Sequence, residues 1–139
     1  MLKAIFWALV GIFVVMASVI VVPVPVSIKR MLFPFMAIFS IAFFLLGLAL
    51  VFLTSKKKVE GRLKKFLILT GVSSAGFLVS VLLHNFLYGA AVVTSHITAL
   101  THLMEFLHAA FFIMAIFICP LGFLIGVVGS VVLFIRKKN

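Results

Sequence analysis

The chain has 139 residues, of which 66% are hydrophobic and only 10% charged, with a mean hydropathy of +1.47. A soluble domain is typically about half apolar and about a quarter charged, so a soluble fold is excluded. The net charge of +10 does not indicate nucleic acid, because the Lys and Arg residues flank long apolar stretches and form no basic face with aromatic side chains. Since each membrane helix needs about 20 apolar residues, the chain has room for about four crossings.

The first predicted span covers residues 4–22. Trp7 lies near one end of it, where an indole prefers the headgroup boundary. A cleaved signal over residues 1–17 is the alternative, because Lys3 gives a short basic start and a small-residue pattern follows the apolar core.

Two prolines, Pro23 and Pro25, are expected to end the first span, because proline lacks a backbone donor and pushes its predecessor toward extended geometry. A short outer link over residues 27–30 should follow. The second predicted span covers residues 31–54 and is apolar nearly all round. Pro34 is expected in its first turn, where a missing N–H is not needed.

Residues 55–65 form a tight basic loop that holds six Lys and Arg residues. One more near the N-terminus and three near the C-terminus bring ten of the twelve basic residues to the same side of the predicted membrane. The other two, Lys29 and Arg30, lie in the outer link. By the positive-inside rule, the basic loop and both termini are predicted to be cytoplasmic.

The third and fourth predicted spans cover residues 66–83 and 109–135, and both carry small residues at helical spacing. Such residues allow close helix approach in lipid, where apolar burial supplies no drive between helices. The predicted packing residues are Gly71 and Ala75, with Thr70 and Ser74 beside them, and Gly122, Gly126 and Ser130. We expect the two spans to contact each other there, with homodimerisation through the same glycines as the alternative. Pro120, which follows the single cysteine Cys119, is expected to kink the fourth span.

An outer amphipathic segment is predicted over residues 84–108, and it contains every histidine of the chain. His102, Glu105 and His108 are spaced i, i+3, i+6, which places them within roughly a 120° arc of a helix. Imidazole and carboxylate are ligands that zinc, copper and non-haem iron accept, although a di-metal bundle needs two such motifs and this chain has one. The interpretations are a polar face at the membrane interface, a metal or haem site, and a proton relay.

The pair His84-Asn85 has two interpretations, a boundary that faces lipid headgroups and a partner for the later histidines across the bundle. The standard nucleophile-elbow, Walker, dinucleotide and zinc-protease motifs are absent, and the chain has no Asp. We therefore expect no enzymatic activity and no cofactor.

Residues 64–76, residues 83–85 and residues 118–126 resemble a family of small uncharacterised prokaryotic membrane proteins. The resemblance covers about the C-terminal half of the chain. It implies a prokaryotic membrane as the location and carries no activity to transfer.

The sequence thus predicts an all-α polytopic membrane protein, a single membrane domain over residues 1–139 that forms a four-transmembrane-helix bundle in the cell membrane. Expected partners are the lipid bilayer and a homo-oligomer or larger membrane complex, with no nucleic acid. The predicted function is that of an accessory or scaffold-like component that associates through helix packing. A small transporter or channel is the first alternative, and an outer-face metal or haem binding protein is the second.

Overall fold

The computed structural model describes residues 1–23, 25–57, 59 and 61–136. Its elements are α1 (Leu2–Val21), α2 (Val26–Lys56), α3 (Gly61–Val93), α4 (Thr98–Ile113), the π-helical turn η1 (Met114–Ile118) and α5 (Cys119–Arg136). Since α4, η1 and α5 run on without a break, the described residues form four helices that are long and apolar enough to cross a membrane, and they contain no strand. The predicted all-α, four-span fold of a multi-pass membrane protein is confirmed.

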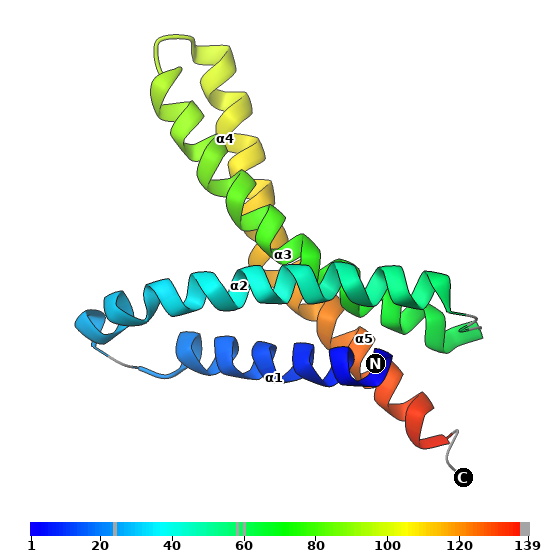
Figure 1. The fold of residues 1–139 in the computed structure, drawn as a ribbon. Coiled ribbons are helices and arrows are strands. Elements are labelled where there is room, and N and C mark those ends of the chain that lie inside the picture. The colour runs from blue at the N-terminus through cyan, green and yellow to red at the C-terminus, as the bar shows by residue number, and fades with distance from the viewer. Residues whose placement is uncertain (24, 58, 60, 137–139) are drawn as a thin grey trace.

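The four helices are arranged as two hairpins that diverge at one end (Figure 1). α1 and α2 lie side by side, and the first half of α3 packs against α2 and α5. The second half of α3 leaves this group together with α4 and projects as a separate helical hairpin. We call residues 80–113 the outer arm, after the side of the membrane predicted for its tip, and the place where it leaves α1 and α2 the fork.

Several predicted boundaries move, because the helices continue through residues that contain no strong breaker. α2 begins at Val26, so residues 27–30 are helical, and Pro34 lies beyond the first turn in which it was expected. The predicted outer segment over residues 84–108 is not a separate connection, since α3 continues to Val93 and α4 begins at Thr98. Polar side chains at a membrane boundary end the apolar stretch, but they do not end the helix.

The basic loop is shorter than predicted because both flanking helices extend into it. α2 includes Lys56, and α3 begins at Gly61, whose φ of +67° is a left-handed conformation that glycine adopts without steric cost. Part of this loop, Lys58 and Glu60, lies outside the described residues.

Pro120 disturbs the fourth crossing by widening one helical turn. In η1 the N–H of Cys119 donates to the carbonyl of Met114, five residues earlier. A proline inside a helix has no N–H to donate, and its ring crowds the carbonyl four residues earlier. The wider π turn directly before Pro120 accommodates that ring and sets the junction between α4 and α5.

The closest packing in the molecule joins α2, α3 and α5 through small residues. A Cβ placed on Gly47 of α2 would lie 2.8 Å from the carbonyl oxygen of Gly71, and one placed on Gly71 would lie 2.7 Å from the carbonyl oxygen of Gly47. Next to this contact, the buried Ser74 hydroxyl donates a 2.6 Å hydrogen bond to the carbonyl of Phe43. The backbones of α2 and α3 therefore touch, and a polar bond ties them together in the apolar interior.

Of the predicted packing residues, Gly122 and Gly126 of α5 pack against α3, whereas Gly71 packs against α2 and not against the fourth span as expected. A Cβ on Gly126 would lie 2.8 Å from the backbone nitrogen of Thr70, and one on Gly122 would lie 2.5 Å from the Ser73 Oγ. Ala75 and Ser130 are buried as well. These glycines therefore serve contacts within one chain, and homodimerisation through them stays a prediction.

Candidate functional site

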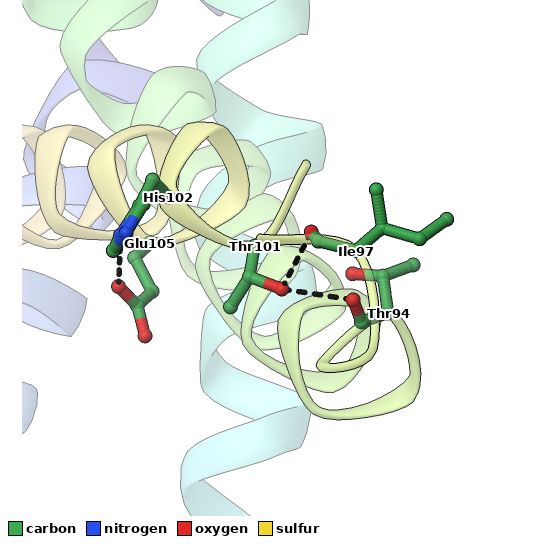
Figure 2. A network of polar contacts seen from close by, with 5 residues as sticks. All are labelled: Thr94, Ile97, Thr101, His102 and Glu105. Atoms are coloured by element: carbon green, nitrogen blue, oxygen red, sulfur yellow. Dashed lines mark hydrogen bonds and ion pairs between the residues drawn. The ribbon is translucent and has the colours of Figure 1, made fainter. Parts of the chain in front are cut away.

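The polar residues of the outer arm gather at its tip, where α3 turns back into α4 (Figure 2). The Thr94 hydroxyl donates to the carbonyl of Ala90 at 2.8 Å. The Thr101 hydroxyl lies 2.8 Å from the carbonyl oxygen of Thr94 and 3.1 Å from that of Ile97, so it bridges the two ends of the turn. The carbonyls of Ala90, Thr94 and Ile97 also accept backbone N–H groups, so the two threonine hydroxyls add a second bond to each and link the end of α3 to the start of α4.

The first predicted ligand pair lies on the exposed side of α4. The Nδ1 of His102 and a carboxylate oxygen of Glu105 are 3.5 Å apart, and both side chains are more than half exposed. Figure 2 shows both pointing away from the turn. Because water screens an exposed pair of this kind, it adds little to stability.

His108 packs α4 against α3. Its ring stacks on that of His84 with centroids 4.3 Å apart, and the Nδ1 of His84 lies 3.1 Å from the carbonyl oxygen of His108. This contact requires the proton of a neutral His84 to sit on Nδ1. Phe112 and Tyr88 flank the stack at 5.1 Å from His84 and 5.5 Å from His108.

The predicted metal ligands are therefore divided. His102 pairs with Glu105 on the exposed side, while the ring of His108 stacks on that of His84. Within the described part of the chain, no group of three or more His, Cys, Asp or Glu side chains could hold a metal ion. Of the two interpretations of His84, the structure shows the contact with a later histidine.

An open groove runs between α3 and α4 near the tip, with a volume of about 650 Å³. Its polar lining comes from Tyr88, Ser95, Thr101, Glu105 and His108. Residues 66–135 contain no Lys or Arg, and Glu105 is the only acidic residue among them. The groove can therefore accept a hydrogen-bond donor or a cationic group.

Large apolar side chains of α3 and α4 in the arm are not covered by the rest of the described chain. α4 contains no buried residue. Phe86 of α3 and Phe106 of α4 are each 71% exposed, and Leu103 and Val93 are also exposed. The sequence showed that these residues are apolar, but only the course of α3 and α4 shows that they lie on a projecting hairpin.

Comparison with known proteins adds no relative. No protein-family model matches the chain, and neither does any curated protein or solved structure in the two other searches. The resemblance of the C-terminal half to small prokaryotic membrane proteins remains a prediction.

Proposed function

We propose that this protein is an accessory component of the cell membrane, and that its outer arm is the part that binds a larger membrane protein. The observation that carries this proposal is the lack of buried residues in α4, whose contacts are mainly with α3. A hairpin that projects from the other helices presents two apolar helices to whatever lies beside it in the membrane.

The chemistry of the arm fits a partner with an apolar helix and a basic group. Phe86 and Phe106 supply large aromatic surfaces, and aromatic side chains are enriched among residues that dominate binding energy. Glu105 lines the groove between α3 and α4 and would pair with a Lys or Arg of the partner. Within the chain itself Glu105 meets only the exposed His102.

The proposed orientation has both termini and the basic loop in the cytoplasm and the arm tip outside. Ten of the twelve Lys and Arg residues lie on the predicted inner side. Among them, Lys3 and Lys56 lie over the rings of Phe134 and Phe52 at 5.2 and 4.9 Å, as expected for lysines that reach from a helix end toward the headgroups.

The experiment is cross-linking and co-purification from the membranes of the native host. Phe106→Ala should reduce the yield of the cross-linked partner about tenfold or more, as expected for a residue that dominates binding. Phe33→Ala is the matched control, because Phe33 is 73% exposed but lies on α2, outside the arm. Equal partner yields for the two variants would contradict a role of the arm.

Two other measurements test the alternative functions. Solute flux in proteoliposomes would favour the transporter, and a Soret band or stoichiometric metal would favour the metal or haem binding protein.

A further inference from the structure

The fork contains a cavity that the proposed accessory role does not use. Its volume is about 260 Å³, and its walls come from α1, α2, α3, η1 and α5. For comparison, an engineered apolar cavity of about 150 Å³ stays dry and binds benzene. The space at the fork is therefore large enough for a small organic group.

Aromatic rings form one wall of the cavity. Phe13 stacks on Phe123 with centroids 4.6 Å apart, Phe123 lies 5.1 Å from Phe43, and Phe43 lies 6.4 Å from Phe77. All four rings line the cavity, and they come from four different helices. Because the rings support one another, this wall is held in place without a ligand.

One polar side chain on the cavity wall is left without a partner. Ser73 is 8% exposed, and its hydroxyl makes no hydrogen bond to any described residue. The other polar group on the wall, the thiol of Cys119, has Ser80 as a partner. The Ser73 oxygen is not fully buried, unlike the unpartnered hydroxyls of Thr54 and Ser130, so it is accessible to a ligand in the cavity that it lines.

The apolar walls and the free hydroxyl together select for one kind of molecule. In a bilayer, pure hydrocarbon gains little by moving from lipid into a protein cavity, because both surroundings are apolar. A hydrogen bond to Ser73 supplies the missing preference, since a polar group dissolved in lipid has few other partners.

We propose that the fork cavity is a binding site for a membrane-dissolved neutral lipid or isoprenoid that has an apolar body and one hydroxyl or carbonyl group. Its oxygen bonds to the Ser73 hydroxyl and its body lies against the four phenylalanine rings. The adjoining π turn belongs to the site, because Pro120 and Ile116 both line the cavity.

Photolabelling of the full chain in phosphatidylcholine nanodiscs tests this proposal. The probe is decanol that carries an aliphatic diazirine, with adducts located by mass spectrometry. We expect adducts on Phe77, Ile116 and Cys119. We also expect excess unlabelled decanol to compete with the probe about three- to tenfold better than decane does, because only decanol can form a hydrogen bond.

Two variants, each with a matched control, test separately the hydrogen bond and the volume of the cavity. Ser73→Ala should reduce labelling by the same factor, while Ser18→Ala, which changes an exposed serine of α1, should not. Ala17→Leu should block the cavity, whereas Ala8→Leu adds the same side chain on an exposed part of α1. Adducts spread evenly over lipid-facing residues, or equal competition by decane and decanol, would overturn the proposal.

Discussion

Replacing Gly126 with Leu should destabilise the protein more than any glycine substitution on a lipid-facing surface. A Cβ at this position would lie 2.8 Å from the backbone nitrogen of Thr70 and 2.9 Å from the carbonyl oxygen of Phe66. Both are backbone atoms, so relief requires α3 and α5 to move apart. Overpacking of this kind typically lowers the free energy of unfolding by about 1–3 kcal/mol. Replacing glycine within a helix offsets about 1 kcal/mol of this loss, because other residues have a higher helix propensity.

Leucine adds three further carbons that must enter the same contact, so we expect a net loss of about 2 kcal/mol or more. In a chain of this size that corresponds to a fall in Tm of roughly 5–10 °C. The assay is thermal unfolding in detergent, followed by circular dichroism and by the size of the remaining folded species.

Gly11→Leu and Gly89→Leu are matched controls, because a Cβ on either glycine would meet no atom within 4 Å. These variants should keep the wild-type Tm or gain slightly from helix propensity. If Gly126→Leu unfolds at the same temperature as the controls, the close contact of α3 with α5 does not exist and the packing account is refuted.

Three further predictions concern the polar contacts. Ser74→Ala should lower the free energy of unfolding by about 1 kcal/mol through loss of the bond between α3 and α2, whereas Ser18→Ala should have little effect because its bond lies within one exposed turn. His84→Leu should speed amide exchange in residues 94–97 by loosening the hairpin, while His102→Ala should not; equal exchange would show that the histidine stack does not hold the arm. Purified protein should bind less than one equivalent of zinc, and one equivalent that is lost on His102→Ala would contradict the divided geometry.

Hydropathy determined the number of crossings, because long apolar stretches separated by charge have few other stable arrangements. Helix ends were less predictable. Residues 84–93 carry His84 and Asn85 at a membrane boundary, but their backbone continues the helix since only Gly89 weakens it.

The packing partners were predictable only where both sides carry a visible pattern. Gly71 and Gly126 belong to repeated small residues, whereas Gly47 is a single glycine in an apolar helix and gave no sign of its contact with Gly71. The arc shared by His102 and His108 was wide enough to place them on different sides of α4, and only the position of α3 decides which of them is covered.

The most direct test of the account is the accessibility of single cysteines in intact cells. The native Cys119 is buried and serves as the unlabelled background. Ser95→Cys at the arm tip should react with a membrane-impermeant maleimide from outside, and Ser55→Cys at the inner end of α2 should react only after the membrane is permeabilised. Labelling of Ser55→Cys in intact cells, or protection of Ser95→Cys until permeabilisation, would contradict an outer arm that projects from a membrane bundle with its basic side in the cytoplasm.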